Sequence, residues 1–256
     1  MTAAVILAAG RGSRLGKYTR HLPKALVRAG GRSLLGWHCH ALRECGVSPV
    51  IVAGGYLSER IEHAQLELVD VPHWSETGPL ASLRATQPAR LGQDFLVVYA
   101  DCPHHASNLR RLLTVTDDIA VVGDRAWRPL WQQRHAQPLD DAESYRGAGG
   151  LLQAIGARPS HLDEIDAQFA GLLRFTQEGW QCAERALTQS ASPPTDMTGL
   201  LALLLGRGER IADVPIHGRW CEIDSADDLR LCRRRLRDAT GWSHDWRDSA
   251  DEPRWP

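Results

Sequence analysis

Short apolar runs alternate with amphipathic segments along the first half of the chain, and no other feature of the sequence constrains the fold as strongly. This alternation is typical of β–α–β units, in which mainly parallel strands are buried between helices. We therefore predict an α/β fold, a Rossmann-like mixed but mainly parallel sheet flanked by helices. The predicted strands are residues 4–8, 49–53, 67–71, 95–99, 119–122 and 210–215, and the predicted helices are residues 33–45, 58–64, 79–86, 108–113, 196–206 and 225–239.

Composition narrows the class of protein. The 256 residues are enough for one large α/β domain, and 30 Lys and Arg against 31 Asp and Glu give no excess of positive charge for a nucleic acid. The six cysteines form no CxxC pair, which is typical of reduced thiols. Because no apolar stretch has the length of a membrane span and the first residues lack the features of a signal peptide, we expect a cytoplasmic protein without a membrane or nucleic-acid partner.

A cationic, glycine-rich loop follows the first predicted strand. The apolar run of residues 4–9 opens into Gly10-Arg-Gly-Ser-Arg-Leu15, and Leu22-Pro-Lys-Ala-Leu26 comes soon after. Glycines leave backbone N–H groups free to bind phosphate oxygens, and Arg11, Arg14 and Lys24 add positive charge where a polyphosphate would lie. The loop therefore predicts a nucleoside triphosphate as ligand.

Two better-known glycine motifs do not fit this loop. A dinucleotide-binding motif needs a third glycine at position 15, where the chain has Leu15. A P-loop ending at Lys17 needs glycine at position 11 and Ser or Thr at position 18, where the chain has Arg11 and Tyr18. Neither hydride transfer nor P-loop ATP hydrolysis fits the sequence.

Two aspartates stand where a divalent cation is expected. Asp101 follows the predicted strand 95–99, and Asp224 lies directly before the predicted helix 225–239, with Glu222 on the same face of an extended segment. Ligands of such a sheet bind beyond the carboxyl ends of its strands, where the glycine loop and Asp101 both lie. Because sites that bind nucleoside triphosphates commonly hold a divalent cation between carboxylates and phosphates, we predict that Asp101 and Asp224 bind Mg²⁺. The alternative for each aspartate is a helix N-cap.

The pattern Leu-Ala-Ala-Gly-x-Gly-x-Arg-Leu, followed by Pro-Lys, resembles the signature of nucleotidyltransferases, which join an NTP to a phosphorylated acceptor and release pyrophosphate. Residues 71–83 resemble a segment of phosphocholine and phosphonate cytidylyltransferases. Five further segments match the same group in order: residues 121–131, 138–143, 171–173, 196–198 and 220–224. The resemblance implies the fold of the nucleotide-diphospho-sugar transferases, with CTP and Mg²⁺ as ligands.

The resemblance also implies roles for individual residues. The implied nucleotide-binding residues are Leu7, Ala8, Ala9, Gly10, Gly12, Ser13, Arg14, Lys24, Thr77, Gly78 and Ser82. Residues 8–10 would contact base and ribose, and residues 12–14 the triphosphate. Arg14 and Lys24 are the implied catalytic residues, with Lys24 on the α-phosphate, and residues 77, 78 and 82 would line the cytosine pocket. Thr77 and Ser82 could instead cap a turn and a helix.

The acceptor is predicted to be a small phosphonate or phosphomonoester. Its oxygen is anionic at neutral pH, so it can attack the α-phosphorus without a general base. At the positions where the acceptor is expected to bind, relatives carry apolar or acidic residues. This chain has polar, alanine or proline residues there, and it keeps several arginines nearby. We therefore predict that His104, His105, Arg125 and Arg128 bind a strongly anionic acceptor such as phosphonoformate, in a likeness to the phosphonoformate cytidylyltransferases of phosphinothricin-type antibiotic pathways.

Other interpretations remain. A phosphocholine cytidylyltransferase or a sugar-1-phosphate nucleotidyltransferase would share the glycine loop and the aspartates, and an inactive nucleotide-binding regulatory protein could keep them. Cys102, His104 and His105 could form a transition-metal site or a turn at a helix start.

We expect a single domain over residues 1–240. It would comprise a nucleotide-binding core at 1–123, an acceptor-binding insertion at 124–195, where the alternation breaks into short mixed segments, and a metal-binding return to the core at 196–240. Residues 241–256 are polar, with Trp242, Trp246 and Trp255, and would form either a C-terminal tail or a strap held by these tryptophans.

Overall fold

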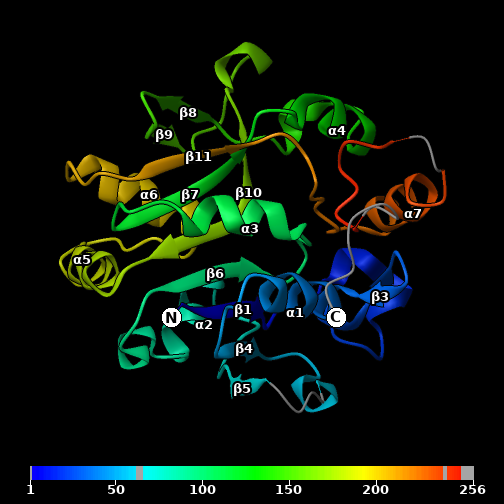
Figure 1. Ribbon diagram of the computed structural model, residues 1–256, viewed down its shortest axis with the longest axis horizontal. Coiled ribbons are helices and arrows are strands. Elements are labelled where there is room, and N and C mark those ends of the chain that lie inside the picture. Colours follow the sequence, from blue (N-terminus) through cyan, green and yellow to red (C-terminus); the bar gives the residue numbers. More distant parts are fainter. Residues whose placement is uncertain (1, 62–65, 239–240, 249–256) are drawn as a thin grey trace.

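A nine-stranded sheet crosses the molecule (Figure 1) in the computed structural model, which describes residues 2–61, 66–238 and 241–248. Its strands are, in spatial order, β5 (Glu67–Asp70), β4 (Val50–Gly54), β1 (Ala3–Ala8), β6 (Phe95–Tyr99), β10 (Gln168–Phe175), β7 (Ile119–Asp124), β11 (Ala212–Ile216), β9 (Leu151–Ile155) and β8 (Tyr145–Ala148). Strands β5, β4, β1 and β6 are parallel, as are β7 and β11, whereas β10 runs antiparallel between β6 and β7. The predicted mixed, mainly parallel sheet is confirmed.

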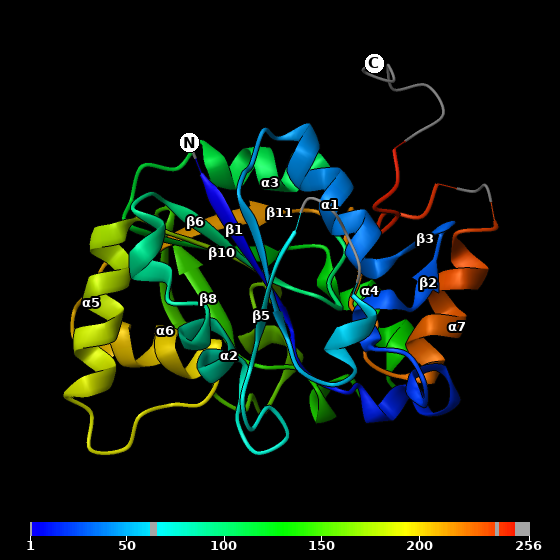
Figure 2. The same ribbon diagram turned by 90° about the horizontal axis from the view of Figure 1, so that it is seen from below.

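Helices cover both faces of the sheet (Figure 2). One core cluster contains residues of α1 (Leu34–Glu44), α3 (Ala106–Leu113), α4 (Trp127–Arg134) and α7 (Ala226–Arg235), and the other contains residues of α2 (Pro79–Ala85), α5 (Gln177–Thr188) and α6 (Met197–Gly206). Strand β1 shows why both faces are needed: Ala4 and Ile6 belong to the first cluster, and Val5 and Leu7 to the second. Because successive strand side chains point to opposite faces, a run that is apolar throughout must be buried on both.

Shorter elements complete the fold. Strands β2 (Arg28–Ala29) and β3 (Arg32–Ser33) form a separate hairpin. The 3₁₀ turns are η1 (Ser13–Thr19), η2 (Lys24–Leu26), η3 (Ser58–Arg60), η4 (Pro88–Leu91), η5 (Pro138–Asp140) and η6 (Leu162–Glu164).

The predicted helix starts are largely confirmed by side-chain caps. Ser33 accepts a hydrogen bond from the backbone N–H of Gly36 at 3.0 Å and begins α1, and Ser225 does the same for Asp228 at 3.1 Å at the start of α7. The predicted helix 58–64 differs, because only the turn η3 forms there. Residues 62–64 of that prediction, and residue 239 of the predicted helix 225–239, lie outside the described residues.

The region 124–195, expected to be an insertion over the site, contributes three strands that the sequence did not predict. Strands β8 and β9 form one edge of the sheet, and β10 lies near its centre. Strand β10 lacks a clear strand pattern because it buries the polar residues Gln168 and Arg174 and contains Gly171 with a positive φ of 68°. These polar groups find partners across the fold, such as Asp117 and Asp94 for Arg174, which periodicity cannot show.

The first part of the C-terminal segment packs as a strap. The side chain of Trp246 is 1% exposed, and His244 Nε2 lies 2.9 Å from Asp124 Oδ2 at the end of β7. Of the two alternatives, the strap therefore holds for residues 241–248. Residues 249–256, with Trp255, lie outside the described residues.

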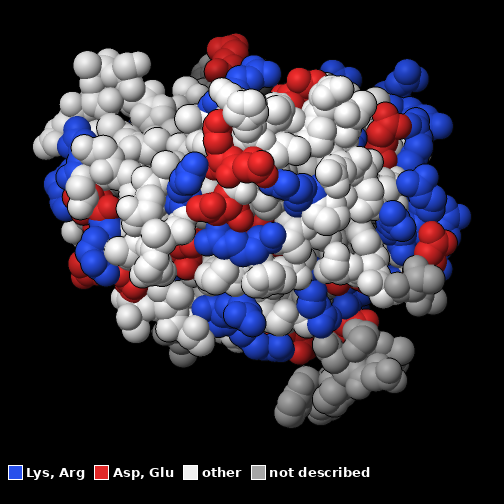
Figure 3. Space-filling model, turned by 90° about the horizontal axis from the view of Figure 1, so that it is seen from above, with Lys and Arg blue, Asp and Glu red and all other residues white. Residues whose placement is uncertain are grey.

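Acidic and basic side chains lie close to one another over the face seen from above (Figure 3). Ion pairs join several acidic and basic side chains of the described residues, such as Arg128 and Asp163 at 2.8 Å. Within the described ranges, none of the helices has the length and apolar character needed to cross a membrane.

Two buried histidines give the fold a pH dependence. Burial lowers the pKa of His38 to about 4 and that of His104 to about 3, although each ring donates a hydrogen bond to a carbonyl oxygen, that of Ala100 and Ala170 respectively. Below pH 6.5, these two histidines therefore bind more protons in the unfolded chain than in the folded one. As the pH falls from 6.5 toward the folded pKa values, the free energy of unfolding decreases.

We expect His104→Gln to weaken this dependence. Between pH 7 and pH 5, the free energy of unfolding should fall by about 2 kcal/mol less in the variant than in the wild type, as urea unfolding at the two pH values would measure. The exposed His21→Gln serves as the control. Equal pH slopes for the wild type and the His104 variant would contradict the assignment.

Candidate active site

The glycine-rich loop leaves β1 and turns into η1 with little room for side chains. Gly12 has a φ of 65°, and a Cβ atom placed on it would lie 2.7 Å from the Cδ atom of Lys24. The Gly12 carbonyl accepts hydrogen bonds from the Leu15 N–H and the Thr19 hydroxyl, both at 3.0 Å. The loop is therefore shaped for a glycine whose backbone lies against the Lys24 side chain.

Replacing Gly12 by alanine should displace Lys24. The new methyl group requires a strained φ and occupies space taken by the lysine stem, so we expect kcat to fall by roughly 10²-fold. Steady-state measurement of pyrophosphate release, the reaction that the sequence resemblance implies, would test this. Gly31→Ala is a control for glycine loss, since that residue also has a positive φ, but no atom lies within 4 Å of its Cβ position. Equal losses in the two variants would show that backbone strain, and not the contact with Lys24, is responsible.

A cavity of about 330 Å³ opens beside this loop. Its lining contains every residue predicted to bind the nucleotide or the metal: Leu7, Ala8, Ala9, Gly10, Gly12, Ser13, Arg14, Lys24, Thr77, Gly78, Ser82, Asp101 and Asp224. The carboxyl ends of β1 and β6 supply the loop and Asp101, because these neighbouring strands are parallel and end at one edge of the sheet. Asp224 arrives from the segment before α7.

A lysine lies between the two predicted metal ligands. The Lys24 ammonium is 2.6 Å from Asp101 Oδ2 and 2.8 Å from Asp224 Oδ1, and Arg14 also pairs with Asp224. Burial alone would lower the pKa of Lys24, but the two carboxylates raise it above its usual range. Burial alone would likewise raise the pKa of Asp101, and the ammonium lowers it. The site is therefore a compact cluster of fixed charges, with Lys24 protonated and Asp101 ionised.

The oxygen donors of this cluster suit Mg²⁺. The ion is usually held by one or two carboxylates, with water and substrate phosphates completing its shell, and Asp101 and Asp224 offer such a pair beside the glycine loop. Among residues 2–61, 66–238 and 241–248, no three His, Cys, Asp or Glu side chains converge as a metal site. The possible transition-metal cluster at Cys102, His104 and His105 is therefore not formed.

The four residues predicted to bind the acceptor do not line the cavity, and each has another partner. His104 stacks on Trp220 with ring centroids 5.6 Å apart, and as a buried ring with a lowered pKa it is neutral. His105 caps α3 by accepting a hydrogen bond from the Ser107 N–H at 3.1 Å. Arg125 pairs with Asp213, and Arg128 with Asp163. The structure thus gives each of these four side chains a partner within the chain, which residue type does not reveal, and their binding of the acceptor stays a prediction.

The cavity wall also contains two aromatic residues for which the sequence motifs predicted no role. Trp74 and Tyr99 line the cavity, and Trp74 also meets the ring of Tyr56 edge-on at 5.6 Å. Arg11, from the glycine loop, lies over the same Tyr56 ring at 5.3 Å. The signal available for Tyr99 was its position at the carboxyl end of a predicted strand, two residues before Asp101. The signal available for Trp74 was that it lies within residues 71–83, which resemble a segment of the cytidylyltransferases.

Comparison with known proteins supports this assignment. Residues 4–164 match the model of the MobA-like NTP transferase domain family. The chain is 29% identical over 248 residues to the CTP:phosphoglutamine cytidylyltransferase of Campylobacter jejuni, an alignment that covers 89% of this chain and 98% of the relative. It is 34% identical over 135 residues to the CMP-5'-(3-aminopropyl)phosphonate synthase of Streptomyces rubellomurinus, which covers half of this chain and 21% of that protein.

A solved structure shares the fold. The inositol-1-phosphate CTP transferase from T. maritima superposes with a TM-score of 0.72 over 93% of this chain and 97% of the other, at 20% sequence identity. The resemblance to cytidylyltransferases that the sequence motifs carry is thus confirmed, and with it the nucleotidyltransferase fold. The match to the family model and the cavity at the carboxyl edge of the sheet together show that the chain belongs to the MobA-like NTP transferase domain family.

Proposed function

We propose that this nucleotidyltransferase transfers CMP from CTP to a small phosphonate or phosphomonoester and releases pyrophosphate. The observation that carries the proposal is the convergence of the glycine loop, Lys24 and two carboxylates on one cavity. The relatives that act with CTP on phosphorylated small molecules support the choice of nucleotide and acceptor class.

The residues of the cavity suit an in-line displacement at the α-phosphorus. An acceptor oxygen forms the new bond to this atom while the bond from it to the bridging oxygen breaks, and pyrophosphate leaves with the electron pair. The backbone of residues 10–13 would hold the phosphates, and Lys24 and Arg14 would neutralise charge around the reacting centre. When bound by Asp101 and Asp224, Mg²⁺ would add positive charge against a repulsion of about 4 kcal/mol between two anions about 4 Å apart.

The hydrogen bonding of Thr77 favours cytosine over uracil. Thr77 lines the cavity, and its hydroxyl donates to the carbonyl oxygen of His73 at 3.1 Å, so the hydroxyl oxygen would meet the base as an acceptor. Cytosine carries an amino group at C4 and can donate to this oxygen, whereas uracil carries a carbonyl there and cannot. The geometry therefore supports CTP as the donor nucleotide.

A pyrophosphate-release assay tests the proposal. The protein, Mg²⁺ and each of CTP, UTP, dTTP and ATP would be combined with phosphonoformate, 3-aminopropylphosphonate, phosphocholine and glucose 1-phosphate in turn. We expect release with CTP and at least one of the first three acceptors. Release only with glucose 1-phosphate and UTP or dTTP would identify a sugar-1-phosphate nucleotidyltransferase, and nucleotide binding without turnover on any acceptor would support a regulatory role.

A further inference from the structure

A buried arginine contacts residues on both sides of Asp224 in the chain. Arg134 is the last residue of α4, and its side chain is 2% exposed. Its Nη1 atom lies 2.6 Å from Glu222 Oε2 and its Nε atom 3.0 Å from Asp228 Oδ1, while the guanidinium carbon is 4.7 Å from the centre of the Trp131 ring. Burial alone would lower the pKa of Arg134, but the two carboxylates raise it, so the guanidinium is charged.

The partners of Arg134 lie on either side of Asp224 in the chain. Asp228 Oδ2 accepts hydrogen bonds from the backbone N–H of Asp224 at 3.2 Å and from that of Ser225 at 2.9 Å. Glu222 lies two residues before Asp224, on the same extended segment. Arg134 therefore holds both ends of the turn from which the Asp224 carboxylate reaches Lys24.

The hydrogen bonds of Arg134 explain why this contact matters for the position of Asp224. Without the guanidinium, the side chains of Glu222 and Asp228 would both lose the donor that they share, and a buried polar group left without its partner is costly. Lys24 is already engaged with Asp101 and Asp224. Loss of Arg134 should therefore move the turn and take Asp224 away from the place where the phosphates would lie.

We propose that Arg134 is a positioning residue that fixes Asp224 for the nucleotide and its metal, and so links α4 to the nucleotide site. It does not line the cavity and has no role in the chemistry itself. The inference rests on the proposed function only for the identity of the nucleotide.

Arg134→Met and Arg134→Lys test the inference, with Arg110→Met as the control. Arg110 lies on another helix, α3, and its side chain is 51% exposed, with Glu44 as its partner. We expect Arg134→Met to lower kcat by 10- to 100-fold and to weaken Mg²⁺-dependent CTP binding, measured by calorimetry, by about 10-fold, with little change in the KM of the acceptor. Lysine should restore part of both losses, since it supplies the charge but not the fork of donors. Arg110→Met should stay within twofold of the wild type.

The outcomes separate this inference from the proposed function. If the wild type turns over no acceptor, the role of Arg134 can still be tested by calorimetry, which measures the affinity for CTP with and without Mg²⁺. A folded Arg134→Met variant that binds CTP with wild-type affinity and Mg²⁺ dependence would overturn the inference. If that variant does not fold, Asp228→Asn replaces it, since asparagine cannot accept from Arg134 and from the Asp224 backbone with both side-chain atoms. Wild-type Mg²⁺-dependent CTP binding in Asp228→Asn would equally overturn the role.

Discussion

Replacing Asp101 or Asp224 by asparagine is expected to lower kcat by roughly 10³-fold and to leave the fold intact. Asparagine keeps the shape of the side chain but removes the charge that would hold a divalent cation against the triphosphate. The fold should survive because Lys24 lies between both carboxylates, at 2.6 Å from one and 2.8 Å from the other, so either variant leaves the ammonium one charged partner.

Two measurements check this result. Pyrophosphate release at saturating CTP would give kcat, and circular dichroism with thermal unfolding would show that the variants fold. Asp163→Asn is the matched control, since the Asp163 side chain is 90% exposed and its partner, Arg128, lies outside the cavity lining. If both variants turned over within twofold of the wild type, the two aspartates could not be the metal ligands.

The part of the site that could be predicted consists of the residues whose position follows directly from the fold class. The glycine loop follows β1 and Asp101 follows β6, and neighbouring parallel strands bring their carboxyl ends to one edge. The contact between Lys24 and Asp224 spans 200 residues, and neither periodicity nor spacing indicates it. For Asp224 the resemblance to cytidylyltransferases carried the prediction, with the helix that follows it as the only local signal.

The residues predicted to bind the acceptor show what sequence could not resolve. His104, His105, Arg125 and Arg128 have side chains that can bind an anion, but they can equally stack, cap or form ion pairs. Which of these happens depends on remote residues such as Trp220 and Asp213, which the fold brings next to them. His105 alone gave a local hint, because it lies just before a predicted helix.

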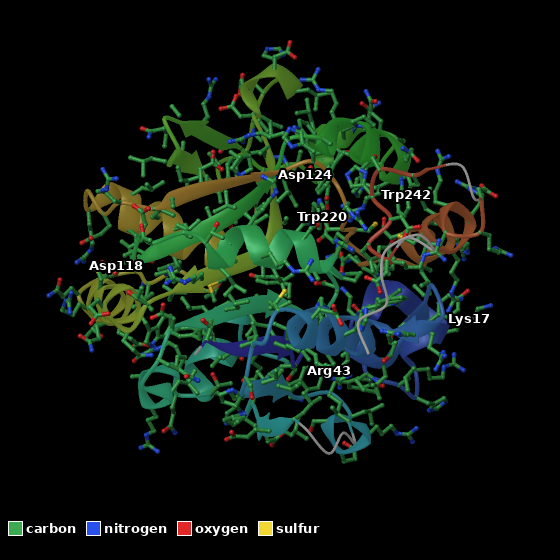
Figure 4. All side chains as sticks on the ribbon, in the orientation of Figure 1. Lys17, Arg43, Asp118, Asp124, Trp220 and Trp242 are labelled. Carbon is green, nitrogen blue, oxygen red and sulfur yellow. The ribbon has the colours of Figure 1, made fainter. Side chains whose placement is uncertain are left out.

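Asp124 is the clearest case of a residue whose role only the structure reveals. It lies at the end of β7, is fully buried, and stands beside Trp220 (Figure 4). Its Oδ1 atom accepts from the backbone N–H groups of Ala126 and Gly218, and its Oδ2 atom accepts from the side chains of Trp220 and His244, all at 2.9 Å. One carboxylate thus joins β7, the segment that leads to Asp224, and the C-terminal strap.

Asp124→Asn should therefore destabilise the protein by about 3 to 5 kcal/mol and lower the Tm by roughly 10 °C. The NH2 end of the asparagine amide cannot accept hydrogen bonds, so the two donors that face this end are left buried and unpaired. The dependence of the free energy of unfolding on pH should also change in the acid range. Burial alone would raise the pKa of Asp124, but hydrogen bonds from His244 and Trp220 hold it below its usual value. Its contribution is therefore complete above the ordinary carboxyl pKa and lost as pH falls through the lower folded value.

Urea unfolding at pH 7 and pH 3.5 separates these two effects. The gap between wild type and Asp124→Asn should be largest at pH 7 and should narrow at the lower pH, because the wild-type carboxylate begins to lose its advantage there. Asp163→Asn, exposed and far less constrained, should track the wild type at both values. Asp124 contacts the segment that carries Asp224, so we regard its carboxylate as an anchor of both the strap and the site. If Asp124→Asn unfolded at the same urea concentration as the wild type, this role would be contradicted.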